Sequence, residues 1–249
     1  MLFDLDGTLV DSVDLILASY AHAGLAVLGA APAPDEARRW IGRGLVDIYG
    51  GYPPEQSAAL IAAYREFNAA HFEAMTQRYP GLPELLRRLV EAGVRCAVAT
   101  SKGRGSAQAS LDFAGLSEFV EIAATAETTE THKPDPAPLL AAAAHLGVTP
   151  ETMVYVGDAV VDCQAARAAG MASVLVTWGA GTLEDLRRAA PDGLVDDAAQ
   201  LARLLLPPTE AETPAAVAHR DAGRSLPPAE GETGAGQPAE PADQPWWGR

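Results

Sequence analysis

The sequence predicts an α/β protein: a doubly wound parallel-sheet core with a small all-helical segment inserted after the first strand. Two patterns indicate this fold class. From residue 82 onward, short apolar runs alternate with stretches of helical length, as in parallel sheets whose two faces are covered by helices. Before them, residues 13–79 show helical periodicity only. With 249 residues, 48% of them hydrophobic, the chain can build one large core or a core with an insertion.

The first strand and the insertion come first along the chain. Residues 1–5 are a short apolar strand that meets two acidic residues. The expected elements after it are a helix that starts after Ser12, a short helix over 35–40, a flexible turn over 41–45, and a long helix that begins at Pro54 and ends before the Pro/Gly stretch 79–83. His71 lies on the apolar face of the long helix, so we expect a packing residue there.

The second half of the chain alternates regularly. Strands are expected at 94–99, 120–123, 152–156, 172–177 and 194–195, and helices at 84–92, 106–114, 136–146, 160–169, 183–189 and 198–206. Open sheets of this kind bind their ligands at the carboxyl ends of the strands, where the strand order reverses. Polar residues at these strand ends are therefore the first candidates for a functional site.

The last segment, residues 207–249, has a different composition. It holds eight Pro and five Gly among 43 residues, with few aliphatic side chains before Trp246 and Trp247. Such a segment buries too little apolar surface to offset the entropy of ordering it, so we expect a disordered tail. A docking role for the two tryptophans is the alternative.

Charge and cysteine content exclude some partners. There are 33 acidic and 18 basic residues, a formal net charge of −15, which argues against nucleic acid or an anionic membrane as the main partner. A small anionic substrate stays compatible, because a local cationic pocket can outweigh the overall field. Cys96 and Cys163 are expected to be buried free thiols. No basic segment precedes the first apolar residues and no apolar run reaches about 18 residues, so we expect a cytoplasmic protein.

The most informative stretch is residues 1–12. Asp4 and Asp6 follow the first strand at a spacing of two, which directs both carboxylates to the same side. Gly7 allows a sharp turn, and Thr8 offers a hydroxyl beside it. Two carboxylates this close favour either a divalent metal or a nucleophile paired with a general acid. The simpler alternative is an acidic turn after an edge strand.

Three more polar groups follow predicted strands. Thr100, Ser101 and Lys102 end one of them, Lys133 stands in an extended loop before a helix, and Asp158 with Asp162 spans a strand end and the first turn of the next helix. Each alone is explained by helix capping or by a solvated charge. The chain has 18 basic residues and only two of them are lysines, Lys102 and Lys133, which favours a specific use of both ammonium groups.

Together these segments resemble the four motifs of the haloacid dehalogenase-like hydrolase superfamily, in order, over about residues 1–206. The resemblance implies a Rossmann-like core formed by 1–12 and 80–206, with 13–79 as an α-helical cap that closes over the site. It also implies a phosphatase in which Asp4 is the nucleophile and Asp6 the general acid/base. Thr100 would orient the phosphoryl group and Lys133 would offset charge. Because Asp6 is present, the resemblance argues against dehalogenation, since dehalogenating members lack this residue.

The resemblance further implies a cofactor and a substrate class. Mg²⁺ would be held by Asp4, the backbone carbonyl of Asp6 and Asp158, with Asp162, Ser101 and Lys102 in supporting positions. Residues 40–44 and the Thr100-x-Lys102 pattern look most like phosphoglycolate phosphatases and their pyrophosphatase relatives. A small phosphorylated metabolite is therefore the expected partner, and hydrolysis of 2-phosphoglycolate is favoured over the alternatives, a pyrophosphatase or a sugar-phosphate phosphatase or mutase on the same scaffold. Arg43, between two glycines, is expected either to bind the far end of the substrate or to be a solvated surface residue. A non-catalytic interaction protein is the alternative from another class.

Overall fold

The fold was analysed in a computed structural model that describes residues 1–206. A six-stranded sheet lies at its centre, in the order β5-β4-β1-β6-β7-β8, and every neighbouring pair is parallel. The strands are β1 (Leu2–Phe3), β4 (Ala97–Ala99), β5 (Glu121–Ala124), β6 (Val154–Gly157), β7 (Ala172–Val176) and β8 (Gly193–Val195). The first strand of the chain is thus central, with β4 on one side and β6 on the other, and the strand order reverses there.

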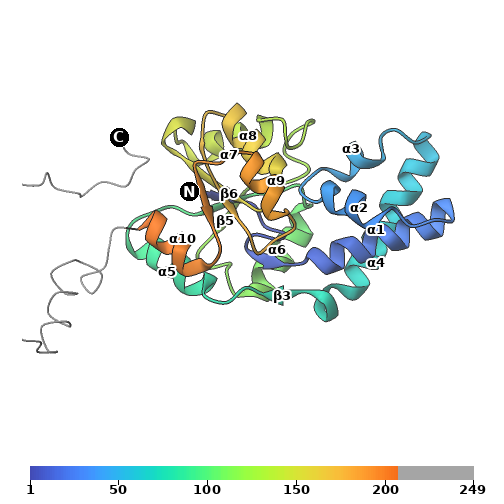
Figure 1. Cartoon of the computed structure of the whole chain (residues 1–249), viewed down its shortest axis with the longest axis horizontal. Helices are drawn as coiled ribbons and strands as arrows, with labels where there is room; N and C mark the ends of the chain where they lie inside the picture. The colour runs from blue at the N-terminus through green and yellow to red at the C-terminus, as the bar shows by residue number, and fades with distance from the viewer. Residues whose placement is uncertain (207–249) are drawn as a thin grey trace, which may run out of the picture.

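Helices cover both faces of this sheet (Figure 1). They are α5 (Leu82–Glu91), α6 (Arg104–Ala114), α7 (Ala137–Leu146), α8 (Val160–Ala168), α9 (Leu183–Arg188) and α10 (Ala198–Leu205), with a 3₁₀ turn at Pro150–Thr152. Successive side chains of β1 point to opposite faces of the sheet, and each face has its own apolar core. Phe3 packs with α5, α6 and α10 on one face, and Leu2 packs with α7 and α8 on the other. The predicted doubly wound parallel sheet is confirmed.

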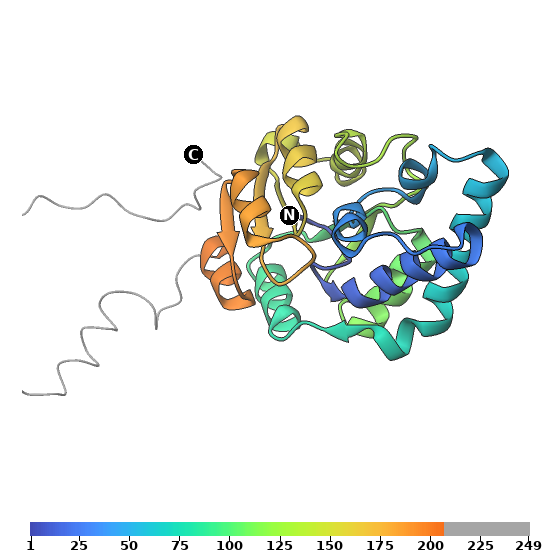
Figure 2. The same ribbon diagram turned by 45° about the vertical axis from the view of Figure 1, so that its right-hand side comes forward.

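The helical cap lies at one end of this core, as Figure 2 also shows. It consists of α1 (Val13–Leu28), α2 (Pro34–Trp40), α3 (Leu45–Tyr49) and α4 (Pro54–Met75). These helices share an apolar cluster of their own, centred on Ile16, Tyr20 and Leu60. The aromatic ring of Tyr20 packs against Trp40 and Tyr64, with centroids 5.4 and 5.0 Å apart. The cap therefore has a separate core, and the predicted residue limits of the two domains stay a prediction.

Two short elements of the cap differ from the sequence prediction. The sequence predicts a flexible turn over 41–45 and no helix directly after it, where the structure has α3, and it predicts only helices within 13–79. Instead, β3 (Gln77–Arg78) pairs antiparallel with β2 (Val10–Asp11) where the chain leaves and re-enters the core. His71 is exposed, but it stacks on Phe67 with ring centroids 3.9 Å apart, and its Nδ1 lies 2.9 Å from the Phe67 carbonyl, so it packs on the helix surface and does not line the cavity. Elements of two to five residues carry too few positions for periodicity to detect.

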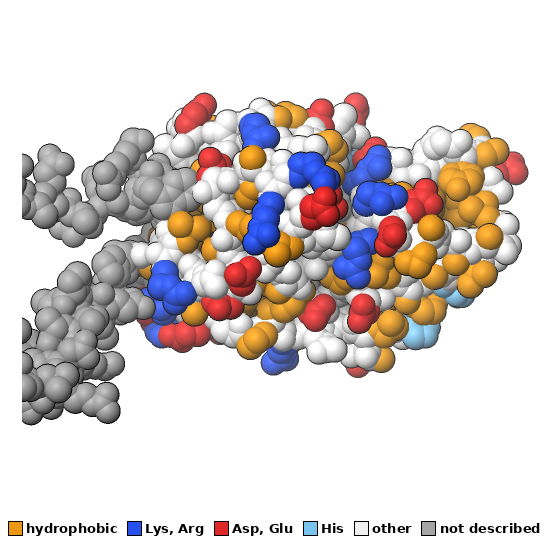
Figure 3. All heavy atoms as spheres, in the orientation of Figure 1, with side chains coloured by type: hydrophobic (Ala, Val, Ile, Leu, Met, Phe, Trp, Pro, Cys, Tyr) orange, Lys and Arg blue, Asp and Glu red, His pale blue; other side chains and the backbone are white. Residues whose placement is uncertain are grey.

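The surface and the cysteines add two observations. On the face seen in Figure 3, acidic and basic side chains are interspersed over the core, whereas apolar side chains gather on the cap. Within residues 1–206, no helix is both long and apolar enough to cross a membrane. Cys96 and Cys163 are buried free thiols, as predicted. The predicted disordered tail, with Trp246 and Trp247, lies outside the described residues.

Candidate active site

The loop after β1 brings the first acidic residue into the protein interior. The Asp4 amide extends the pairing of β1 with β6 by donating to the Val156 carbonyl at 2.8 Å, and Asp4 as a whole is only 2% exposed. Gly7 then turns the chain with a φ of +79°, and a Cβ atom there would lie 2.3 Å from Asp158 Oδ2. Only glycine allows this conformation and this close approach. The turn therefore places the first loop directly against the end of β6.

Four charged side chains meet at this point. Candidate ligand atoms of Asp4, Asp158 and Asp162 all lie within 4.8 Å of one another. The buried Lys133 ammonium lies 3.0 Å from Asp4 Oδ1 and donates to Asp162 Oδ1 at 2.7 Å. It also donates to the Tyr155 hydroxyl at 3.0 Å. We call Asp4, Lys133, Asp158 and Asp162 the acidic centre.

Each carboxylate of the acidic centre is held in a defined orientation. Asp162 Oδ2 accepts from the backbone amides of Asp158 and Ala159, at 3.2 and 2.9 Å, at the start of α8. Asp158 accepts from the Thr8 hydroxyl at 3.0 Å and from the Ala180 amide at 2.7 Å. Asp4 Oδ1 accepts no hydrogen bond, even though Lys133 is close to it. Asp4 is thus the member of the centre with an oxygen free for another ligand.

Burial strongly affects the ionisation of this centre. Burial raises the pKa of Asp4 to about 7, although the nearby Lys133 charge opposes the shift. The pKa of Asp158 is raised by burial and by the neighbouring Asp162 and Asp4 charges. Burial alone would lower the pKa of Lys133, but Asp162 and Asp4 hold it well above its ordinary value. Three carboxylates therefore share one ammonium group, which leaves negative charge that a cation would neutralise.

This arrangement suits a hard divalent cation. An all-oxygen donor set with excess negative charge is what Mg²⁺ prefers. Candidate ligand oxygens of Asp4 and Asp158 lie within 4.8 Å of each other, and no hydrogen bond is directed at Asp4 Oδ1. Asp162 binds the Lys133 ammonium and two backbone amides, whereas each Asp158 oxygen accepts from one neutral donor, Thr8 or Ala180, so Asp162 is the more strongly held of the two. The donor set therefore fits a metal ion on Asp4 and Asp158.

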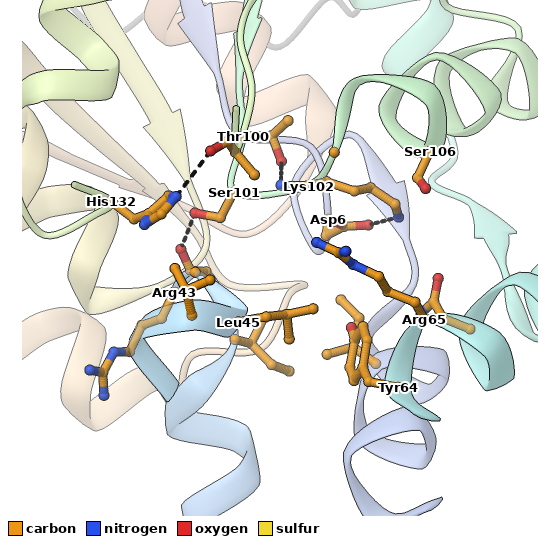
Figure 4. A pocket seen from close by; sticks show the side chains of 18 of the residues that line it. Asp6, Arg43, Leu45, Tyr64, Arg65, Thr100, Ser101, Lys102, Ser106 and His132 are labelled. Atoms are coloured by element: carbon orange, nitrogen blue, oxygen red, sulfur yellow. Dashed lines mark hydrogen bonds and ion pairs between the residues drawn. The ribbon is translucent and has the colours of Figure 1, made fainter. Parts of the chain in front are cut away.

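A cavity of about 520 Å³ opens above the acidic centre (Figure 4). Its core side includes Asp4, Asp6, Thr100, Ser101 and Lys102, and its cap side includes Ile16, Tyr20, Leu45, Tyr64 and Arg65. Core loops and cap helices thus enclose one space. A cavity of this size is typical of a site for a small molecule.

Asp6 and Asp4 face the same cavity but have different partners. Asp6 Oδ1 accepts from Ser12 Oγ at 2.6 Å and from Lys102 Nζ at 2.7 Å. In residues 1–206, neither of these donors reaches the other oxygen of Asp6. Lys102 also lies 5.8 Å from the centre of the Phe72 ring of α4. The two acids therefore occupy separate environments, one inside the core and one at the cavity wall.

The other predicted residues take distinct places. Thr100 is buried at the end of β4, and its hydroxyl accepts from the Lys102 amide at 3.2 Å. Ser101 Oγ donates to the Gly42 carbonyl of the cap at 2.8 Å, which joins cap and core. Arg43 borders the cavity and also a second hollow lined by Asp47 and His132, and its guanidinium points away from Asp6 in Figure 4.

Sequence reasoning missed several residues of the site. Tyr155 links Lys133 to the sheet by donating to the Ala99 carbonyl at 3.0 Å. His132 binds Asp47 of the cap, with Nδ1 and Oδ2 3.1 Å apart. Arg65 extends from α4 into the cavity (Figure 4). Of these, only His132 gave a signal in the sequence, because it directly precedes Lys133.

A parallel sheet with an acidic centre at its carboxyl edge and a helical cap above it defines the class of capped α/β enzymes. A family model described as haloacid dehalogenase-like hydrolase matches residues 1–176, and the chain belongs to this family.

A phosphoglycolate phosphatase of Nitrosococcus oceani is 34% identical, over 82% of this chain and 95% of the relative. The pyrophosphatase PpaX of Halalkalibacterium halodurans is 32% identical, over 77% and 89%. A hydrolase from Pseudomonas syringae has a similar structure, with a TM-score of 0.74, 28% identity, and coverage of 80% and 94%. The chain is thus an enzyme of the hydrolase class with phosphatases among its relatives.

Proposed function

We propose that this enzyme is a Mg²⁺-dependent phosphatase that hydrolyses a small phosphate monoester through an aspartyl-phosphate intermediate. The observation that carries the proposal is the pairing at the cavity floor of a buried Asp4, with an unbonded oxygen beside Lys133, and a separate Asp6 on the wall. A nucleophile and a proton-transferring group in different environments can serve two roles in one reaction. The family match supports the same chemistry.

The first half-reaction would use both acids. An Asp4 oxygen attacks phosphorus, the bond from phosphorus to the leaving oxygen breaks, and Asp6 gives its proton to that oxygen. Ser12 and Lys102 both bind Asp6 Oδ1, which leaves Oδ2 to carry the proton. In the second half-reaction Asp6 takes a proton from water, and the water oxygen attacks phosphorus and frees Asp4. Inorganic phosphate and the alcohol are the products.

Lys133, Thr100 and the metal ligands would support these steps. Lys133 holds Asp4 in place and reduces repulsion between this carboxylate and the phosphoryl oxygens. The Thr100 hydroxyl lines the cavity and would orient the phosphoryl group. Asp4, Asp158 and the Asp6 carbonyl would hold Mg²⁺, with Asp162 supporting. When bound, Mg²⁺ supplies positive charge to the phosphoryl oxygens.

We take 2-phosphoglycolate as the first substrate candidate and pyrophosphate as the second. Both are small and fit a cavity that the cap closes, and both correspond to activities named for relatives above 30% identity. The partner would thus be a small phosphorylated metabolite. The predicted cytoplasmic location belongs to this proposal and stays a prediction.

A phosphate-release assay tests the proposal. The purified full chain is incubated with 2-phosphoglycolate, pyrophosphate, a sugar phosphate and p-nitrophenyl phosphate, each with Mg²⁺ and with a chelator. We expect turnover with Mg²⁺, loss of turnover with the chelator, and the highest kcat/KM for 2-phosphoglycolate. No turnover of any of the four substrates with Mg²⁺ would contradict the proposal and favour a non-catalytic interaction protein, and turnover of pyrophosphate alone would favour a pyrophosphatase. Full turnover in the chelator would contradict the metal requirement alone.

A further inference from the structure

One cation on the cavity wall has no role in the mechanism above. Arg65 lies on α4 beside Tyr64, and its guanidinium extends into the cavity toward the side where Asp6 lies (Figure 4). Asn68, one helical turn further on, lines the same cavity. Arg65 thus lies on the face of α4 that the cap presents to the acidic centre.

The other cations near the cavity are already paired or directed elsewhere. Lys102 is 2.7 Å from Asp6, and Lys133 lies between Asp4 and Asp162. Arg43 points away from Asp6 (Figure 4). Among residues 1–206, Arg65 makes no hydrogen bond and no ion pair, and its side chain is exposed. Its five N–H donors are therefore available to a ligand.

The position of Arg65 is set by contacts around it. Asn68 donates to Ser19 Oγ of α1 at 3.2 Å, which ties this part of α4 to the rest of the cap. Further along α4, Phe72 packs edge-on against Phe113 of the core helix α6, with centroids 5.5 Å apart. Contacts on both sides of the cavity thus hold α4 beside the site.

The surroundings of Arg65 also point to an anionic ligand. Apart from Arg43 and Asn68, the cap side of the cavity is formed mainly by apolar and aromatic side chains such as Ile16, Leu45 and Tyr64. The acidic centre on the opposite side repels any anion that is not coordinated there. A single guanidinium on an apolar wall can bind a carboxylate or phosphate through two parallel hydrogen bonds.

We propose that Arg65 binds a second anionic group, a carboxylate or a phosphate, on the leaving-group end of the substrate. The reacting phosphoryl group would lie at Asp4, and the second anion would lie across the cavity against α4. This inference rests on the proposed function, because it assumes which end of the substrate reacts. It assigns selectivity for doubly anionic substrates to α4, and it competes with the sequence-based expectation that Arg43 has this task.

The kinetic test compares substrates with and without a second anion. For Arg65→Ala we expect kcat/KM for 2-phosphoglycolate, relative to p-nitrophenyl phosphate, to fall by roughly 10- to 100-fold, the effect of losing charged hydrogen bonds. The kcat/KM for pyrophosphate, relative to p-nitrophenyl phosphate, shows whether Arg65 binds a second phosphate as it binds a carboxylate. Arg65→Lys keeps the positive charge but not the two parallel N–H donors of the guanidinium. It should therefore restore part of the preference for 2-phosphoglycolate over p-nitrophenyl phosphate. Arg187→Ala removes an exposed guanidinium that does not line the cavity, and serves as the matched control.

Two kinetic results would overturn the inference. An equal loss on all three substrates in Arg65→Ala would assign Arg65 to folding or cap closure. If Arg43→Ala lowers kcat/KM for 2-phosphoglycolate relative to p-nitrophenyl phosphate and Arg65→Ala does not, binding of the second anion belongs to Arg43. In either case the proposed phosphatase activity itself would still stand.

A binding measurement separates the inference from the proposed function. In the full-length Asp4→Asn background, titration calorimetry with 2-phosphoglycolate and with pyrophosphate measures affinity without turnover. We expect Arg65→Ala to weaken binding of at least one of them by roughly 10- to 100-fold and to weaken binding of inorganic phosphate much less. If wild-type protein hydrolyses no ester, the proposed function fails, whereas this difference in affinity would still support the Arg65 site. Equal affinities of Asp4→Asn with and without the added Arg65→Ala change, for both substrates, would overturn the inference.

Discussion

The core side of the cavity and its cap side hold their polar groups in different ways. On the core side, Asp158 and Asp162 each accept two or more hydrogen bonds, and Lys133 is surrounded by Asp4, Asp162 and Tyr155. On the cap side, Arg65 is exposed and makes no bond within residues 1–206. A buried, satisfied network keeps reacting groups in one geometry, whereas an exposed cation is free to adapt to a ligand.

This difference assigns chemistry to the core and substrate selection to the cap. Substitutions in the acidic centre should damage the reaction or the fold for every substrate. Substitutions that only affect the contact between cap and core should have small effects that do not depend on the substrate. The four predictions below test this division, from the largest expected effect to the smallest.

The largest effect is expected for Asp4→Asn. An amide cannot form the aspartyl phosphate, so steady-state turnover of 2-phosphoglycolate and of p-nitrophenyl phosphate should both disappear. The fold should persist, because the amide has the shape of the carboxylate and, although it loses the ion pair to Lys133, it also removes the repulsion between Asp4 and the carboxylates of Asp158 and Asp162. Phosphate release and the melting temperature check the two expectations. Substantial turnover by a clean preparation would rule out the covalent mechanism.

Asp6→Asn should retain the nucleophile and lose proton transfer. We expect kcat to fall by roughly 10²- to 10⁴-fold for a poor leaving group. The loss should be smaller for p-nitrophenyl phosphate, whose leaving group needs less protonation. Comparison of kcat for the two esters measures this. Equal losses on both esters would show that Asp6 acts mainly through charge or through its contact with Lys102.

The two lysines give a direct comparison between buried and partly exposed ion pairs. The Lys133 side chain is 1% exposed and the Lys102 side chain 11%. Lys133→Met leaves Asp4 and Asp162 without a buried counter-charge and should lower the free energy of unfolding by about 3 kcal/mol. Lys102→Met should lower it by less than about 1 kcal/mol, since Asp6 can be hydrated at the cavity wall. Urea unfolding of both variants measures the two changes in free energy. Equal changes would contradict the distinction between the buried Lys133 and the partly exposed Lys102 at the cavity wall.

The smallest effect is expected for Ser101→Ala. This change removes the hydrogen bond to the Gly42 carbonyl, a contact between core and cap worth about 1 kcal/mol. We expect kcat/KM to fall by about fivefold, and by the same factor for substrates with and without a second anion. A loss confined to 2-phosphoglycolate would mean that Ser101 contacts the substrate and does not only stabilise closure.

Much of the core could be predicted from local patterns. The polar residues at strand ends, such as Asp4, Thr100 and Asp158, were located because parallel strands place their carboxyl ends at one edge of the sheet. The elements missed were short ones such as β2, β3 and α3, whose formation depends on contacts with other segments. His71 packs on Phe67 as expected, but its exposure could not be predicted, because helical periodicity indicates a face of α4 and not what covers that face.

The sequence by itself determined the order of the elements, the identity of the acidic centre and the family, since these depend on local periodicity and on residues at strand ends. Tertiary structure decided which groups meet. Thr8 and Asp158 are 150 positions apart, yet they share a hydrogen bond because Gly7 turns the first loop against β6. It also decided that Arg65 points into the cavity and Arg43 points away from Asp6. The direction of a side chain on a cap depends on how the cap docks on the core, and that docking is formed by long-range contacts that no local pattern encodes.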